Sequence, residues 1–194
     1  EFVNEDSFWD EQKIHTLYAQ SKFLAEKEVR LASEKGLETI IVNPGFIDML
    51  PLRKWDTENY IELVNLLLQK FPTVRIIITG RQDEMAQSER FEERLTDKTR
   101  VINFCGKTSV RQLLTLYSRA SLLIATDSGV AHFASITSIF SVVLFGPETP
   151  VLYQPLTRNS KVIYKNLPCS PCYNVYNNRV SPCRDNLCLK TITV

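Results

Sequence analysis

Short apolar runs alternate with amphipathic stretches along most of the chain. Runs of strand length occur at residues 39–42, 74–79, 100–104, 121–126, 140–145 and 161–164. Between them, helical spacing predicts helices that begin at Asp56 or Thr57 and after Thr108 or Ser109, and further helices from about Asp83 to Leu95 and near residues 130–137. Strands that alternate with helices indicate right-handed crossovers. We therefore predict an α/β fold, a Rossmann-like parallel sheet with helices on both faces.

The two ends of the chain differ from this middle part. Residues 10–34 carry apolar positions at helical spacing and predict one long amphipathic helix before Gly36. Residues 166–194 are rich in cysteine and loop-forming residues. We expect a structural helical segment over 1–42, a Rossmann-like domain over 43–165, and a Cys-rich tail over 166–194 that packs on the domain.

One junction is the strongest candidate for a ligand site. The apolar run from Ser121 stops at Thr126-Asp127-Ser128-Gly129, and a helix start that contains His132 follows at once. In a parallel sheet this junction lies at the carboxyl edge, where free N–H groups at a helix start favour an anion such as a pyrophosphate. Glycine turns after the other strands, Gly80 among them, are expected at the same edge.

Charge and composition limit the partners. Apolar residues make up 44% of the 194 residues and charged residues 23%, which is ordinary for a globular protein. The 23 basic and 22 acidic residues are interspersed, so the net charge of +1 gives no electrostatic case for nucleic acid. No stretch has the length of a transmembrane segment, and the first residues do not resemble a signal peptide. We expect a cytoplasmic protein.

Six ordered motifs resemble glycosyltransferase family 9, the heptosyltransferase family of lipopolysaccharide synthesis. They are Asn43-Pro44-Gly45, Leu52-Arg53-Lys54-Trp55, Ile78-Thr79-Gly80 with Glu84, Phe104-Cys105-Gly106-Lys107-Thr108-Ser109, Asp127-Ser128-Gly129-Val130-Ala131-His132, and Leu144-Phe145-Gly146-Pro147-Glu148-Thr149-Pro150. The resemblance implies the donor-binding half of a two-domain GT-B fold. It places Thr126, Asp127, Ser128, Gly129, His132, Gly80 and Glu84 at the nucleotide-sugar donor, and Lys54 beside its diphosphate.

The resemblance also implies a reaction. It is inverting transfer of heptose from ADP-heptose to a lipopolysaccharide or related glycan, at the inner face of the membrane, with no cofactor required. Lys54 would neutralise the departing nucleotide. The family's general base is an aspartate of an N-terminal acceptor domain, which does not fit into residues 1–42. Since the sequence also begins without Met, we expect a fragment or a fused chain that binds donor with little turnover.

Residues 1–45 carry a second resemblance, to extended short-chain dehydrogenases/reductases of the nucleotide-sugar epimerase kind. It rests on Tyr18-Ala-Gln-Ser-Lys22, a long helix, and the strand that ends at Asn43-Pro44-Gly45. It implies a catalytic pair, Tyr18 and Lys22, which the i, i+4 spacing places on one helical face. The family's Gly-rich phosphate loop is missing here. An NAD(P)-dependent epimerase or dehydratase fragment, and a non-catalytic module, remain the alternatives.

Four cysteines of the tail have a spacing used for metal ligands. Cys169, Cys172, Cys183 and Cys188 form C-x2-C, ten residues, then C-x4-C. Such pairs can hold a structural Zn²⁺, form two disulfides in an oxidising environment, or stay free thiols. The sequence leaves the three states open. Cys105 lies on a predicted strand and is expected in the core.

Overall fold

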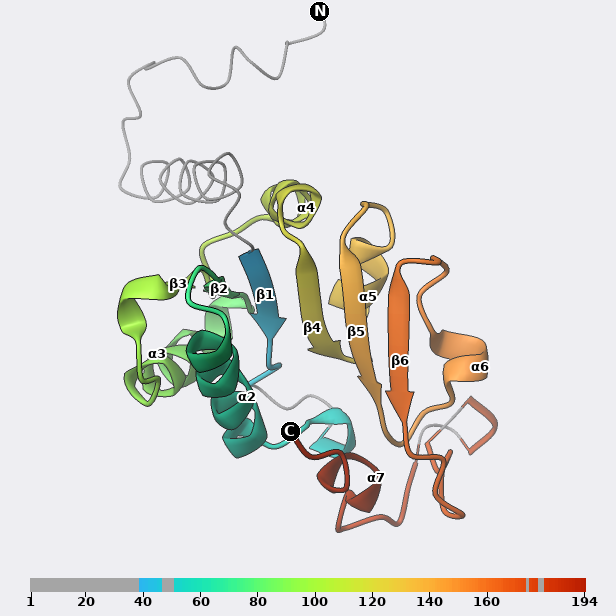
Figure 1. Ribbon diagram of the computed structural model, residues 1–194. Coiled ribbons are helices and arrows are strands. Elements are labelled where there is room, and N and C mark those ends of the chain that lie inside the picture. The colour runs from blue at the N-terminus through green and yellow to red at the C-terminus, as the bar shows by residue number, and fades with distance from the viewer. Residues whose placement is uncertain (1–38, 47–50, 174, 178–179) are drawn as a thin grey trace, which may run out of the picture.

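The predicted alternation of strands and helices forms a single parallel sheet. In the computed structural model, which describes residues 39–46, 51–173, 175–177 and 180–194, the strands are β1 (Thr39–Asn43), β2 (Arg75–Ile78), β3 (Val101–Asn103), β4 (Leu122–Thr126), β5 (Phe140–Phe145) and β6 (Ser160–Tyr164). All pairings are parallel and the order is β3-β2-β1-β4-β5-β6 (Figure 1). The predicted fold class is confirmed. The helix expected over 10–34, and with it Tyr18 and Lys22, lies outside the described residues.

Helices cover both faces of the sheet, as the alternation of side chains along the strands requires. Ile40, Val42, Ile76 and Ile78 pack against α2 (Thr57–Lys70) and α3 (Met85–Glu93). Ile41, Ile77 and Leu123 face the other way, toward α4 (Val110–Arg119) and α5 (Gly129–Ala134). Because both faces are buried, the central strands are continuous apolar runs rather than alternating ones.

The expected helix caps form where their side chains predict them. The Asp56 carboxylate accepts from the amide of Glu58 before α2, and Ser109 and Gln112 form a reciprocal capping box before α4. The helix expected over 130–137 is shorter, since α5 ends at Ala134. There the hydroxyls of Ser135 and Thr137 donate to the carbonyls of His132 and Ala134, which competes with a further helical turn.

The helix expected from Asp83 to Leu95 is divided. A 3-10 turn, η3 (Gln82–Glu84), precedes α3, and the buried Glu84 carboxylate accepts from the amide of Arg81 at 2.7 Å. A carboxylate that satisfies the backbone three residues earlier holds the chain in a tight turn before the helix. The other short 3-10 segments are η2 (Pro51–Arg53), η4 (Lys98–Arg100) and η5 (Val175–Asn177).

The tail returns to the domain. It contains α7 (Leu187–Lys190), and Leu189 and Ile192 enter the core that lies under α2. The Trp55 indole Nε1 donates to the Ile192 carbonyl at 2.8 Å, and the Asn186 Nδ2 donates to the Lys54 carbonyl at 2.9 Å. The segment after β1 is therefore held in place by residues at the far end of the chain. A further short helix, α6 (Pro150–Tyr153), was not expected and precedes β6.

Among the described residues, no helix combines the length and the apolarity that a membrane span needs.

Candidate functional site

The candidate site lies where the order of the sheet reverses. The chain moves from β1 outward through β2 to β3, then returns to β4 on the other side of β1 and moves outward to β6. Ligands of open parallel sheets bind at such a reversal, beyond the carboxyl ends of the strands. Asp127 follows β4 at this point, and its amide donates to the Leu144 carbonyl of β5 at 3.0 Å.

Three charged side chains meet at this edge. Arg53, from η2, donates through Nη2 to Glu148 Oε1 at 2.8 Å, and its Nε lies 3.8 Å from Asp127 Oδ2. The two acids are buried, with 6% of Asp127 and 1% of Glu148 exposed, and Arg53 is about one-fifth exposed. We call Arg53, Asp127, Ser128, Gly129 and Glu148 the edge site.

The edge site holds polar atoms that the described protein does not satisfy. Arg53 Nε, Asp127 Oδ2 and Glu148 Oε2 are all buried and have no hydrogen-bond partner among the described residues. Unpaired buried polar atoms are rare in proteins, because each costs free energy unless a partner is supplied. One donor and two acceptors without a hydrogen-bond partner are thus buried together beside the Asp127 turn, where Arg53 Nε and Asp127 Oδ2 face each other at 3.8 Å.

Burial controls the ionisation of Asp127. Loss of solvent raises the pKa of this carboxyl above its ordinary value, Arg53 opposes that shift, the charge of Glu148 adds to it, and His132 opposes it. His132 is exposed on α5, one turn beyond Ser128. His132 therefore lies close enough to Asp127 to influence the ionisation of its carboxyl.

The start of α5 leaves its backbone open. Ser128 occupies the N-cap position with extended backbone, but its hydroxyl donates back to the Thr126 carbonyl at 3.1 Å and does not cap the helix. Gly129 is exposed, and a Cβ placed on it would meet no atom within 4 Å. The backbone at Gly129 therefore has open space beside it, and the Ser128 side chain does not cap the first N–H groups of α5.

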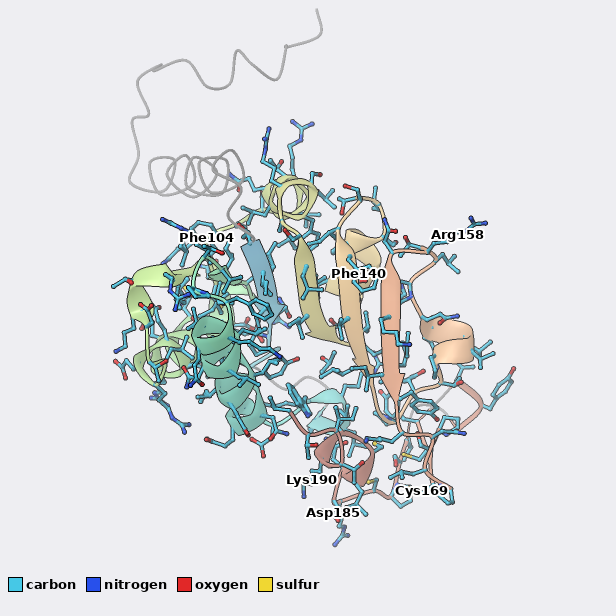
Figure 2. All side chains as sticks on the ribbon, viewed as in Figure 1. Phe104, Phe140, Arg158, Cys169, Asp185 and Lys190 are labelled. Atoms are coloured by element: carbon cyan, nitrogen blue, oxygen red, sulfur yellow. The ribbon has the colours of Figure 1, made fainter. Side chains whose placement is uncertain are left out.

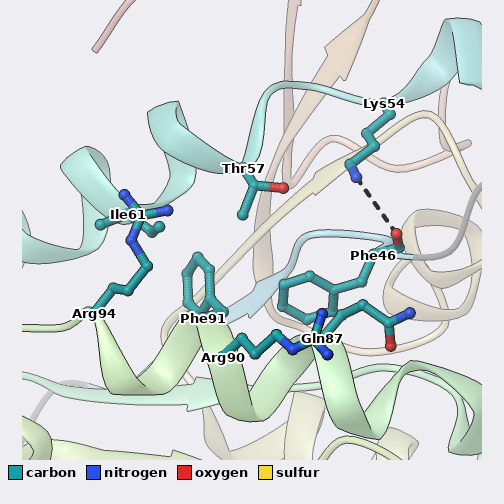
Figure 3. Close-up of a pocket in the computed structure, with 8 residues that line it drawn as sticks. All are labelled: Phe46, Lys54, Thr57, Ile61, Gln87, Arg90, Phe91 and Arg94. Carbon is teal, nitrogen blue, oxygen red and sulfur yellow. Dashed lines mark hydrogen bonds between the residues drawn. The ribbon is translucent and has the colours of Figure 1, made fainter.

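Lys54 does not join this group, although it follows Arg53 directly. Its Nζ donates to the Phe46 carbonyl at 3.4 Å. Figure 3 shows this amine in a different pocket, of about 180 Å³, which Phe46, Phe91, Ile61, Thr57, Gln87, Arg90 and Arg94 complete. The structure brings Arg53, and not Lys54, to the Asp127 turn.

Gly80 and Glu84 lie at the end of β2, two strands from β4. Glu84 is buried rather than on a solvated face, and its carboxylate is used within its own turn. A Cβ on Gly80 would lie 2.9 Å from Glu84 Oε2 and 2.7 Å from Cys105 Sγ, so the glycine is required for packing. Cys105 is buried, as expected for a core residue.

The cysteine tail supports the edge site from outside. The amides of Cys172 and Tyr173 donate to the Pro147 carbonyl, both at 3.0 Å, and the Arg53 guanidinium lies 5.5 Å from the centre of the Tyr173 ring. Tyr173 and Glu148 were not singled out from the sequence, and neither was Arg53. The only sequence signal for Arg53 and Glu148 is that each lies within one of the six family motifs.

No disulfide joins the cysteines in the described part of the chain. Cys169 is exposed at the lower end of the view (Figure 2), whereas Cys188 is buried. Burial raises the pKa of the Cys188 thiol to about 11, and nearby Cys172 and Cys183 also raise it. Within the described ranges, no three Cys, His, Asp or Glu side chains form an arrangement that could hold a metal ion. The present geometry does not fit a Zn²⁺ site, and a metal or disulfide state stays a prediction.

Comparisons with known proteins agree on one family. The model of "Glycosyltransferase family 9 (heptosyltransferase)" matches residues 12–180. Lipooligosaccharide heptosyltransferase 2 of Campylobacter jejuni is 24% identical over 181 residues, which are 93% of this chain and 55% of the relative. The chain thus spans about half the length of this relative.

Solved structures show the same fold. ADP-heptose lipopolysaccharide heptosyltransferase II of E. coli matches with a TM-score of 0.62 and 22% identity, over 72% of this chain and 43% of that one. The E. coli heptosyltransferase WaaC with ADP matches with a TM-score of 0.55 and 20% identity, over 65% and 37%.

Proposed function

Because the chain belongs to glycosyltransferase family 9, the heptosyltransferase family, we propose that its edge site binds the nucleotide-sugar donor of a glycosyl transfer. The observation that carries the proposal is the set of unsatisfied atoms at the reversal of the sheet, one guanidinium N–H and two carboxylate oxygens. A nucleotide sugar has anionic oxygens that accept hydrogen bonds and hydroxyls that donate them. It therefore matches both kinds of atom.

The roles follow from the charges. Arg53 and the open N–H groups of α5 are suited to the diphosphate, since both are donors and both favour negative charge. Asp127 and Glu148 would repel phosphate, so they are assigned to the hydroxyl groups of the sugar. Gly129 lets the phosphates approach the backbone closely.

We further propose that the donor is ADP-heptose and the transfer inverting, with a lipopolysaccharide or related glycan as the acceptor. Support comes from the relatives: one solved neighbour is described as an ADP-heptose heptosyltransferase and another as binding ADP. In transfer, negative charge builds on the departing diphosphate, and Arg53 would stabilise it at the transition state. A carboxylate outside the edge site would take the proton of the acceptor hydroxyl.

This proposal changes one assignment and leaves others. Arg53 takes the role that the family resemblance implied for Lys54, because Arg53 lies beside Asp127 whereas Lys54 donates to the Phe46 carbonyl. Thr126 positions the turn through its carbonyl, which accepts from Ser128. Glu84 and Gly80 shape the turn after β2, and we propose that this turn lies at the nucleoside end of the donor.

Titration calorimetry tests the proposal on the full chain. We expect ADP and ADP-heptose to bind, adenosine to bind far more weakly because it lacks the diphosphate, and NAD⁺ to produce no comparable heat. Circular dichroism of the same sample checks that the protein is folded. A folded chain that binds neither ADP nor ADP-heptose, or binds adenosine as tightly as ADP, would overturn the assignment of the edge site.

A further inference from the structure

Three aliphatic side chains are exposed within six residues beside the edge site. Val151 and Leu152 in α6 are 83% and 59% exposed, and Leu156 just beyond it is 95% exposed. Figure 1 shows α6 outside β6, at the end of the sheet. Single exposed aliphatic residues are common, but a cluster marks a surface that meets something apolar.

The charge around this cluster has one sign. From residue 149 to 184 the sequence contains no acidic residue, but it contains Arg158, Lys161, Lys165, Arg179 and Arg184. Arg158, Lys161 and Lys165 are exposed, and Figure 2 shows Arg158 pointing away from the sheet. The chain as a whole is almost neutral. We define the β6-side surface as Val151, Leu152, Leu156, Arg158, Lys161 and Lys165.

The described tail does not cover this surface. Its apolar residues Leu189 and Ile192 are buried in the core under α2, and its backbone is bonded to Pro147 and to the segment around Trp55. The aliphatic residues of α6 thus stay exposed after the tail has packed. Their occupant must come from outside the described residues.

We propose that the β6-side surface binds the face of an anionic lipid bilayer. Exposed aliphatic side chains gain free energy when they enter the acyl boundary, and lysine and arginine beside them are attracted to negative headgroups. The basic side chains keep their charge in the headgroup layer while their stems lie along apolar material. The absence of acidic residues over the 36 positions 149–184 leaves no negative charge in this segment that anionic headgroups would repel.

The location makes this contact useful for chemistry at a membrane. Glu148 of the edge site directly precedes Thr149, the N-cap of α6. The β6-side surface and the edge site are therefore joined by one short segment. Docking through α6 would hold the edge site close to headgroups and to any glycan attached to a lipid. The inference itself rests on exposure and charge, and it does not depend on what the edge site binds.

Vesicle sedimentation tests the proposal on the full chain, with no nucleotide present. We expect binding to phosphatidylcholine vesicles that contain phosphatidylglycerol, weak binding to pure phosphatidylcholine, and loss of binding at high salt. Leu156→Glu should lower the partition coefficient about tenfold or more. Ile136→Glu, a matched control at a 72% exposed aliphatic position outside the surface, should change it less than about twofold.

A second pair of variants tests the charge. Lys161→Gln should reduce binding to the anionic vesicles about fivefold, whereas Lys70→Gln, at an exposed position on α2, should not. Equal losses in Leu156→Glu and Ile136→Glu would overturn the proposal. Equal binding to neutral and anionic vesicles would also overturn it. Absence of vesicle binding, together with a dimer that Leu156→Glu dissociates, would overturn it as well. The last result would assign the surface to a second copy of the chain.

Discussion

Arg53 Nη2 lies 2.8 Å from Glu148 Oε1, and this ion pair joins the segment after β1 to the turn after β5 across the carboxyl edge of the sheet. The same guanidinium reaches toward Asp127 after β4. One side chain thus links three neighbouring strand ends. About one-fifth of the Arg53 side chain stays exposed, so the residue can hold the edge together and still meet a ligand.

Asp127→Asn should stabilise the fold and weaken the donor site. Since burial raises the pKa of this carboxyl above its ordinary value of 3.8, the folded state keeps the proton at pH values where the unfolded chain has lost it. Stability of the wild type, relative to the variant, therefore falls as pH rises through that interval. We expect the variant to be about 1 kcal/mol more stable at neutral pH, and about equal below pH 3.

Urea unfolding across this pH range measures the difference, and ADP-heptose titration of the same two proteins measures the cost to binding. A variant that is less stable than the wild type at neutral pH would show that the carboxylate is well compensated in the fold. The Asp127 carboxylate would then already be satisfied within the protein and would not depend on a ligand.

Gly129→Ala should separate binding from stability. A Cβ at this position meets no atom within 4 Å, and alanine is the better helix former, so stability should stay equal or rise by about 0.5–1 kcal/mol. If phosphates approach this backbone, the added methyl group should weaken ADP binding about tenfold. Unchanged ADP affinity in a folded variant would move the diphosphate away from α5.

Gly106→Ala is the matched comparison, with the opposite expectation. Gly106 has φ of +70°, and a Cβ there would lie 2.7 Å from Met85 Cγ and 2.9 Å from Gln82 Cα. We expect a loss of about 1–3 kcal/mol in the free energy of unfolding. Urea denaturation of both alanine variants in parallel tests this contrast. Equal stability of the two would contradict it.

The sheet was predictable because its signals are local. Apolar runs such as 74–79 and caps such as Asp56 and Ser109 depend on residues close in sequence, and the structure confirms them. The division of the helix at Glu84 was missed, because it depends on whether one carboxylate turns back to the Arg81 amide or toward solvent. No periodicity reports that choice.

The choice between Arg53 and Lys54 was not predictable for a different reason. Both are cations in one short motif, and the direction of each side chain depends on how η2 is set. Trp55 sets it, being buried and bonded to the carbonyl of Ile192, 137 positions away. A contact so distant in sequence leaves no mark on the local pattern.

Trp55→Phe should therefore affect both the fold and the edge site. The change removes a buried hydrogen bond, leaves the Ile192 carbonyl unsatisfied and opens space, so the free energy of unfolding should fall by about 2–3 kcal/mol. ADP affinity should fall as well, because η2 carries Arg53. Ile192→Val keeps the carbonyl and should cost about 1 kcal/mol with ADP affinity intact. Urea unfolding and calorimetry of the two variants measure both effects, and equal ADP affinity in both would disconnect Trp55 from the site.

The central claim is that Arg53, and not its neighbour Lys54, binds the donor diphosphate. Calorimetric titration of ADP into Arg53→Gln and Lys54→Gln tests it most directly, since the two variants lose the same charge one residue apart. Glutamine is shorter and neutral, so it removes the cation beside two buried carboxylates, and circular dichroism must show that the Arg53→Gln protein is folded before its affinity is compared. We predict a loss of affinity of about 10- to 100-fold for Arg53→Gln and less than about twofold for Lys54→Gln. The reverse order, or equal losses in both, would contradict the claim.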